Sequence, residues 1–468
     1  MSIDPGTFES LVPSRFITFT FPNPSSSSSS TPLHTPLLRI AVLDSPTPPP
    51  TTTTPLTAAL LVPTHRESDW TFSTLSGHLL LLLPHHRISR LILIGNVPSS
   101  PHPTPYNYTC PTHPQPQPLS TIHNSLTSLL LALSPKSSFQ HGIPNIPFLD
   151  YQDDLVRSAV VDTCVGPCVG EMLVEDVELE GKGFRRRLRF KRMPNLVQTQ
   201  VRIVPIDATD TNSDVGFTGL GDLGLFRLDM GGFLVQPYLG PMVAGLSIIG
   251  SCLERRVQDG FRPRALCLGV GGGALATFLG DQLGFEVVGV EADEVVITVA
   301  RKYFGLRESK NVRVCIGDGI RLVQQIAGQG EKLNRDSFGD CLGDKLDTKF
   351  DVIMVDLDSS DARMGTMAPP LEFIEKSVIH AARLAVSDHG ILVINVIPPS
   401  RSFYEKLLHL FREFFAELYE IDVGNGENFV IIATASPAGT GSSVPENSFL
   451  SKLKLVIEGD YMDSIRKI

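Results

Sequence analysis

The feature that most constrains this chain is a regular alternation of strand-like and helix-like segments between residues 264 and 435. Short apolar runs with the length of buried strands are each followed by a stretch of helical periodicity. The expected strands are 264–269, 286–291, 312–318, 351–356 and 391–395. Repeated strand–helix units predict a parallel sheet with right-handed crossovers. Two last strands, 417–422 and 429–434, flank Gly424-Asn425-Gly426, so a closing antiparallel hairpin completes a predicted α/β sheet of seven strands.

The rest of the chain divides by composition. Ser, Thr and Pro dominate the first 36 residues, which predicts a disordered tail because such a segment buries little apolar surface. Further on, Glu180-Gly181-Lys182-Gly183 separates two alternating segments and predicts a β-hairpin. The expected divisions are a tail (1–36), a small α/β piece (37–98), a Pro-rich linker and helix (99–150), a β-hairpin domain with a connecting helix (151–255), the wound-sheet domain (256–436) and a C-terminal tail (437–468).

Net charge and cysteine content limit the partners, the metal or disulfide sites and the cellular compartment that the sequence predicts. Lys and Arg total 40 against 50 Asp and Glu, a net charge of −10, so overall charge argues against nucleic acid or an anionic membrane as a partner. The seven cysteines are scattered, so we expect neither a disulfide framework nor a metal site. A reducing compartment fits this pattern, and we expect a cytoplasmic location. The Ser-rich start keeps a plastid location as the alternative.

A dense basic run covers residues 185–192. Such runs occur in nuclear-import and RNA-binding segments. We favour a β-strand with Leu188 and Phe190 facing inward and the cations facing outward, a face that could also dock an acidic protein.

The strongest chemical signal is the glycine-rich stretch from Gly269 to Gly273, where the first strand of the wound sheet ends and a helix begins. Gly269, Gly271 and Gly273 let the backbone turn sharply and approach a ligand at the carboxyl edge of the sheet. By itself the pattern also fits a nicotinamide-dinucleotide enzyme.

Two acidic positions follow on the next strands. Glu291 ends the second strand, where a carboxylate accepts hydrogen bonds from the ribose hydroxyls of an adenosine cofactor. Asp318 and Gly319 end the third strand, and an acid followed by glycine there suits contact with an adenine amino group. Together with the closing hairpin, this set favours S-adenosylmethionine over NAD.

The fourth strand ends in a cluster of carboxylates, Asp356, Asp358 and Asp361. An amine that attacks a methyl sulfonium must lose a proton, and a carboxylate can hold the ammonium and accept that proton. We therefore name these three acids as candidate catalytic residues. An Asp/Ser turn that caps the next helix is the alternative for one or two of them.

At this point the chain resembles the spermidine synthase-like branch of class I methyltransferases. Asp358-Ser359-Ser360-Asp361 is similar to a DSSD stretch of that branch. Since two residues separate this stretch from the strand end, Asp356 and Asp358 compete for the role of the strand-end acid.

A closer resemblance is to the C-terminal half of the family of methyltransferases that modify lysine and the N-terminus of elongation factor 1-alpha. The similar stretches are residues 65–74, 170–177, 193–199, 242–246, the Gly269 loop, and 356–370. The resemblance implies a Rossmann-like, seven-stranded class I methyltransferase sheet with a small N-terminal β-domain. It also implies methyl transfer to a protein amine, the C-terminal half being associated with the N-terminal α-amine of elongation factor 1-alpha.

The sequence thus predicts an S-adenosylmethionine-dependent protein N-methyltransferase whose partner is a protein substrate, with elongation factor 1-alpha as the candidate. A polyamine aminopropyltransferase is one alternative, but it should carry a Tyr-Gln-Glu-like stretch, and the chain offers only Val235-Gln236-Pro237-Tyr238. A non-catalytic scaffold that keeps the fold is another. A nicotinamide oxidoreductase is disfavoured by Asp318-Gly319 and the hairpin.

Overall fold

The computed structural model describes residues 6–24, 36–47, 54–85, 87–97, 107–111, 119–206, 226–229, 234–328, 349–361, 367–424, 426–438, 448–457 and 459–468. The chain forms two compact units. Unit 1 comprises residues 1–161, 175–184 and 191–196, and unit 2 comprises 162–174, 185–190 and 197–468.

Unit 1 is built on a five-stranded sheet of order β1-β2-β4-β3-β6. Its strands are β1 (Phe16–Pro22), β2 (Leu37–Asp44), β3 (Leu56–Leu61), β4 (Ile88–Asn96) and β6 (Phe148–Leu149), and its helices are α1 (Trp70–Ser73), α2 (Leu75–Leu82) and α3 (Leu119–Ala132). Helices α1 and α2 are separate because the Thr74 side chain caps α2 by accepting from the Gly77 N–H. Strands β3 and β4 are parallel and are joined through α1 and α2.

The prediction of a disordered tail over residues 1–36 is wrong for residues 6–24. Strand β1 pairs antiparallel with β2 from Phe16 to Pro22. The fully buried Arg90 donates to the carbonyl oxygens of Phe8 (2.7 Å) and Ser10 (2.9 Å) and to Asp44 Oδ1 (2.6 Å). The segment thus supplies two carbonyl acceptors to a buried guanidinium, whose other acceptors are Asp44 and the Leu133 carbonyl. The serine run from Ser25 to Ser30 lies outside the described residues.

A six-stranded sheet of order β11-β10-β9-β8-β7-β5 contributes residues to both units. Its strands are β5 (Tyr108–Thr109), β7 (Leu155–Gly166), β8 (Gly170–Leu179), β9 (Gly183–Phe190), β10 (Val197–Pro205) and β11 (Phe226–Leu228). The hairpin β8–β9 was predicted, whereas β7 was not. The basic run does form a strand, but not all its cations face outward, since Arg186 is 3% exposed and lies over the Tyr303 ring.

Unit 2 carries an eight-stranded sheet of order β14-β13-β12-β15-β16-β18-β17-β19. Its strands are β12 (Arg264–Leu268), β13 (Glu286–Glu291), β14 (Val312–Ile316), β15 (Phe350–Val355), β16 (Val386–Val396), β17 (Glu417–Gly424), β18 (Asn428–Thr434) and β19 (Arg466–Lys467). Strands β12 to β16 are parallel, and β18 is antiparallel to both β16 and β17. The seven predicted strands are all present; the eighth, β19, comes from the segment expected to be a C-terminal tail.

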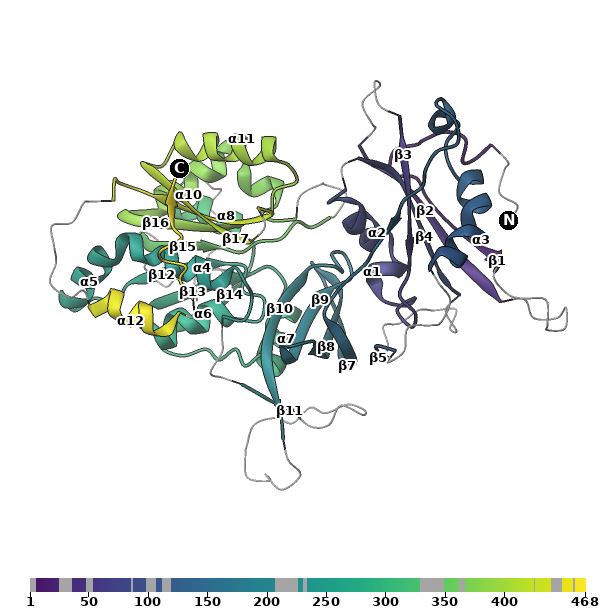
Figure 1. Cartoon of the computed structure of the whole chain (residues 1–468). Helices are drawn as coiled ribbons and strands as arrows, with labels where there is room; N and C mark the ends of the chain where they lie inside the picture. Colours follow the sequence, from purple (N-terminus) through teal and green to yellow (C-terminus); the bar gives the residue numbers. More distant parts are fainter. Residues whose placement is uncertain are drawn as a thin grey trace. The chain divides into compact units, whose positions relative to one another are not determined.

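Helices cover both faces of this sheet (Figure 1). The helices of unit 2 are α4 (Leu239–Ala244), α5 (Gly250–Gln258), α6 (Ala274–Thr277), α7 (Glu294–Tyr303), α8 (Gly319–Ile326), α10 (Lys376–Ala385), α11 (Arg401–Arg412) and α12 (Ser448–Val456). Alternate strand residues enter two separate cores, one with α8, α10 and α11 and the other with α4, α5, α6 and α12. Because both faces are buried, the central strands β12, β13 and β15 are largely apolar, as the sequence indicated.

Candidate functional site

The glycine loop and Asp356 lie where the sheet order reverses. Strand β12 lies between β13 and β15, so the loops that leave β12 and β15 diverge to opposite sides of the sheet. The Gly269 N–H donates to Val290 O (3.0 Å) and the Asp356 N–H donates to Leu268 O (2.9 Å), which fixes both loops to the strand ends. Open α/β sheets bind their ligands at such a switch point.

The glycine loop needs its glycines for two different reasons. Gly269 and Gly273 have φ of 83° and 84°, a region that favours glycine. A Cβ at Gly269 would overlap the carbonyl of Asp356, and one at Gly273 would meet Leu306, so these glycines permit close packing. Gly271 has φ of 52°, and the nearest atom to a Cβ there is the Gln198 carbonyl oxygen at 3.7 Å. Gly271 is therefore the least crowded of these three glycines, since a Cβ there would make only an ordinary van der Waals contact.

Glu291 lies against this loop at the end of β13. Its Oε2 accepts from the N–H groups of Val270 (3.1 Å) and Gly271 (3.2 Å), and its Oε1 accepts from Ala292 N–H at 3.0 Å. Burial raises the pKa of this carboxyl, and these backbone hydrogen bonds oppose the rise. Glu291 is therefore held in place at the carboxyl edge of the sheet, and ribose contact by this residue stays a prediction.

Asp318 serves as the N-cap of α8. Its Oδ1 accepts from the N–H groups of Ile320 (2.9 Å) and Arg321 (3.3 Å), and its side chain is 52% exposed. A Cβ at Gly319 would lie 3.1 Å from Leu268, so this glycine brings α8 close to β12. The capping role is thus clear, and adenine contact by Asp318 and Gly319 stays a prediction.

Asp356 has the most distinctive surroundings. The Tyr238 hydroxyl donates to its Oδ2 (3.0 Å), and Asn395 Nδ2 lies 3.5 Å from its Oδ1. Burial raises the pKa of Asp356 to about 6; the negative charges of Asp358 and Glu291 add to the rise, while the two side-chain hydrogen bonds oppose it. Asp356 is therefore a carboxylate that changes protonation state close to neutral pH.

The other two acids of the cluster differ from each other. The charge of Asp358 raises the pKa of Tyr238, Glu291 and Asp356, so Asp358 belongs to the same group of carboxylates. The backbone of Asp361 closes a turn in which its carbonyl accepts from the Ser359 hydroxyl (3.2 Å). A role for the Asp361 side chain stays a prediction, and residues 362–366 lie outside the described part of the chain.

Sequence reasoning missed Tyr238 and Asn395. The stretch 235–238 was considered only as a poor match to an amine-binding motif, although its tyrosine reaches the strand-end acid. Asn395 is 3% exposed and ends the apolar run of β16, which is a recognisable signal for a functional polar residue. Within the described residues its buried Oδ1 has no hydrogen-bond partner, and an orphaned acceptor next to an acid suits an incoming N–H donor.

Several of the motifs that suggested the resemblance have packing roles. Residues 242–246 lie in and directly after α4, and Gly245 lets this segment approach Ile432 and Val393 of the sheet. Thr199 would contact a Cβ at Gly272, so β10 packs against the glycine loop. The carboxylate of Asp293 accepts from the N–H groups of Cys168 (2.8 Å) and Val169 (2.9 Å), which attaches the β7–β8 turn next to Glu291.

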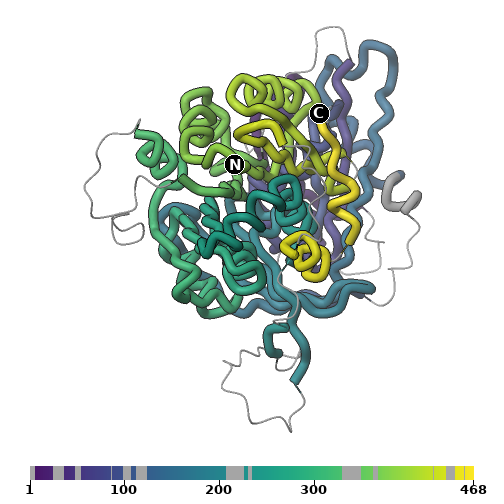
Figure 2. Tube along the Cα trace, turned by 90° about the vertical axis from the view of Figure 1, so that its left-hand side faces the viewer, coloured from purple at the N-terminus to yellow at the C-terminus, as the bar shows by residue number. Residues whose placement is uncertain are grey.

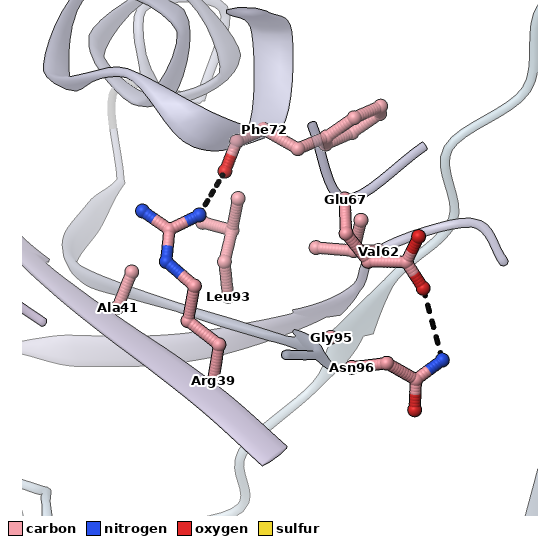
Figure 3. Close-up of a pocket in the computed structure, with 8 residues that line it drawn as sticks. All are labelled: Arg39, Ala41, Val62, Glu67, Phe72, Leu93, Gly95 and Asn96. Carbon is pink, nitrogen blue, oxygen red and sulfur yellow. Dashed lines mark hydrogen bonds between the residues drawn. The ribbon is translucent and has the colours of Figure 1, made fainter. Parts of the chain in front are cut away.

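A small cavity in unit 1 does not offer a comparable site. It has a volume of about 10 Å³ and is lined by Arg39, Ala41, Val62, Glu67, Phe72, Leu93, Gly95 and Asn96 (Figure 3). That is space for one water molecule. Its polar groups already have partners, since Arg39 donates to Phe72 O (3.3 Å) and Asn96 donates to Glu67 (2.9 Å).

The described residues contain no cluster of His, Cys, Asp and Glu that could hold a metal ion. Among those residues, no helix has the length and apolar character needed to cross a bilayer.

The strand order, the closing antiparallel hairpin, the glycine loop and the strand-end carboxylates together define a Rossmann-like sheet of the class I methyltransferase type. The chain matches no protein-family model. It is similar to the eEF1A lysine and N-terminal methyltransferase of Danio rerio, with 26% identity over 405 residues that cover 83% of this chain and 52% of the relative. The Homo sapiens protein of the same name is 25% identical and covers 86% of this chain and 54% of the relative. The resemblance stated from the motifs is thus confirmed, and the chain spans about half the length of the curated relatives it matches.

Among solved structures, the chain is similar to human Methyltransferase-like protein 13 in complex with SAH. It is 23% identical, covers 48% of this chain and 94% of its own, and has a TM-score of 0.39. The spermidine synthase from Thermotoga maritima is 13% identical, covers 59% of this chain and 73% of its own, and has a TM-score of 0.35.

Proposed function

We propose that the chain is an S-adenosylmethionine-dependent methyltransferase that acts on a protein amine. The observation that carries the proposal is the grouping of Glu291, Asp356 and Asp358, of which Glu291 accepts from the Gly271 N–H of the glycine loop. The charge of Asp358 raises the pKa of both Glu291 and Asp356, and the charge of Glu291 also raises the pKa of Asp356. Three mutually repelling carboxylates favour cationic ligands, and both a sulfonium and an ammonium are cations.

The residues of the site fit this cofactor. Glu291 would hold the ribose, the glycine loop around Gly271 would approach the methionine part, and Asp318 with Gly319 would face the adenine. When bound, S-adenosylmethionine supplies an electrophilic methyl group. The matching features of the chain are the uncrowded backbone at Gly271 and the orphaned Oδ1 of Asn395.

The chain's own chemistry is proton handling at Asp356. The Tyr238 hydroxyl holds Oδ2, and Oδ1 lies toward Asn395. An amine donor positioned by Oδ1 and by Asn395 loses its proton to this carboxylate, whose pKa of about 6 keeps it ionised at neutral pH. Positioning of the amine supplies most of the rate enhancement.

The proposed substrate is the N-terminal α-amine of elongation factor 1-alpha. Support comes from the names of the relatives, which are eEF1A lysine and N-terminal methyltransferases. The chain covers about half of each of those proteins, so this choice of substrate requires its own test.

The experiment measures methyl transfer from isotope-labelled S-adenosylmethionine to an N-terminal peptide of elongation factor 1-alpha. Asn variants of Asp356, Asp358 and Asp361 are compared with Asp388→Asn, an exposed aspartate at the start of β16. We expect turnover at saturating cofactor to fall about a hundred-fold or more for Asp356→Asn, and less for Asp358→Asn, with cofactor affinity nearly unchanged. Near-normal turnover in all three variants would assign these acids to helix and turn capping.

An aminopropyltransferase is the second candidate, and the Tyr238–Asp356 hydrogen bond is the observation that favours it. A parallel assay with decarboxylated S-adenosylmethionine and a diamine separates the two. Product from the diamine and none from the peptide would replace the first proposal with the second, and cofactor binding without either product would indicate a scaffold.

A further inference from the structure

The C-terminal segment of the chain, residues 459–468, reaches the element that carries Tyr238. Before this segment, α12 is attached to α5: Glu254 accepts from the Phe449 N–H (2.7 Å) and from the Ser448 hydroxyl (3.0 Å). At its end, β19 pairs with β17 and the Ile468 N–H donates to Leu418 O (2.9 Å). Both ends are therefore fixed to unit 2, and the yellow trace in Figure 2 runs from α12 to the C-terminus.

Between these two anchors, the Tyr461 ring packs against the first turn of α4. A Cβ on Gly240 would lie 2.8 Å from Tyr461 Cε2 and 3.2 Å from its Cδ2, so the ring occupies the space that glycine leaves. Tyr461 and Tyr238 both pack on the same core cluster. Tyr238 directly precedes α4, and its carbonyl accepts from the Met242 N–H (2.9 Å), so the first turn of the helix sets the position of Tyr238.

We propose that Tyr461 is a positioning residue for the amine site: its ring holds the start of α4, and thereby the Tyr238 hydroxyl, in hydrogen-bond contact with Asp356. The inference rests on the proposed function, since it assigns the C-terminal segment a part in that reaction. Tyr461 touches no reacting group and acts through Tyr238. Residues 459–468 thereby contribute to the geometry of the amine site.

The groups that face Asp356 determine how the loss of Tyr461 is measured. Asp358 and Glu291 raise the pKa of Asp356, and the hydrogen bonds from Tyr238 and Asn395 lower it. The charge of Asp356 also raises the pKa of the buried Cys267 thiol. A displaced Tyr238 weakens one of the two hydrogen bonds that lower the pKa of Asp356, so this pKa rises. The acid limb of the pH–turnover profile then moves to higher pH.

The test compares Tyr461→Ala with Tyr461→Phe, which keeps the ring, and with Tyr419→Phe. Tyr419 is contacted by Lys467 of the same segment but lies on β17. We expect Tyr461→Ala to lower turnover at pH 6 about two- to five-fold, with little change at pH 8.5 and no change in cofactor affinity. Both Phe variants should keep the wild-type profile. A Tyr461→Ala protein that melts earlier but keeps the wild-type profile would overturn the inference.

A second measurement does not depend on turnover. NMR titration of ¹³C-labelled aspartate carboxyls, with the Asp356 signal assigned by its loss in Asp356→Asn, reports the ionisation of this residue directly. Tyr461→Ala should move that titration to higher pH, and an unmoved titration would refute the role of Tyr461. If instead the wild-type protein methylates no amine while the titration moves as expected, the proposed function fails and the positioning contact stands.

Discussion

Replacing Tyr238 by Phe tests the central contact of the site. The change removes a hydroxyl that donates to Asp356 Oδ2 at 3.0 Å and keeps the ring. Because this hydrogen bond lowers the pKa of Asp356, which is about 6, its loss raises that pKa further. The ionised form is the proton acceptor, so the acid limb of the turnover profile moves to higher pH.

The size of the shift follows from the strength of the lost bond. A hydrogen bond to a charged group contributes about 1.5–3 kcal/mol, and one pKa unit corresponds to about 1.4 kcal/mol. Asp356 keeps part of its solvent exposure, so water replaces part of the lost interaction. We therefore expect the pKa of Asp356 to rise by about one unit. Turnover at pH 6 should then fall about five-fold, whereas turnover at pH 8.5 should change by less than about a tenth.

The assay is turnover at saturating cofactor from pH 5 to 9 on the peptide substrate, with Tyr419→Phe as the control tyrosine. Asp358→Asn provides a control of opposite sign, because it removes a charge that raises the pKa of Asp356. Its limb should move to lower pH. An unmoved limb in Tyr238→Phe, or a limb moved to lower pH, would refute the assignment of Asp356 as the proton acceptor.

Three further predictions follow from the same contacts. Glu291→Ala removes a charged acceptor at the glycine loop, and calorimetry should show a fall in S-adenosylmethionine affinity of about ten- to a hundred-fold; equal affinity would exclude the ribose role. Deleting residues 1–24 removes β1 and two of the carbonyl acceptors of Arg90. The melting temperature should therefore fall by about 10 °C or more. A fall of only one or two degrees would mean that the segment adds nothing to the stability of the fold. Since the pKa of Asp356 is raised by burial, its protonated form stabilises the fold at low pH and that stability is lost as pH rises through about 6. Asp356→Asn should therefore melt above the wild type at pH 8, by an amount that shrinks toward pH 4, and a constant difference would show that Asp356 does not titrate as stated.

Much of unit 2 could be predicted from local sequence. The strands β12, β13 and β15 are largely apolar runs followed by, or ending in, glycine or acidic residues, because a parallel sheet covered on both faces buries most side chains of its central strands. Strand-end acids are visible for the same reason, since a carboxylate directly after an apolar run lies at the sheet edge. Glu291 and Asp356 were found in this way, and the structure places both at the switch point.

Elements with weak local signals were missed. Strand β1 follows a Pro- and Ser-containing start and is stabilised by pairing with β2 and by the buried Arg90, neither of which local composition reveals. The same holds for β19, whose two residues form a strand only because β17 offers an open edge.

The division between sequence and tertiary structure is clearest at Asp356. Its place at the end of an apolar strand follows from the sequence, because strand periodicity and residue type are local properties. Its chemistry does not, since Tyr238 lies 118 residues earlier and Asn395 39 residues later. Burial and these two hydrogen bonds set the pKa of the carboxyl, and both depend on which segments the folded chain brings together.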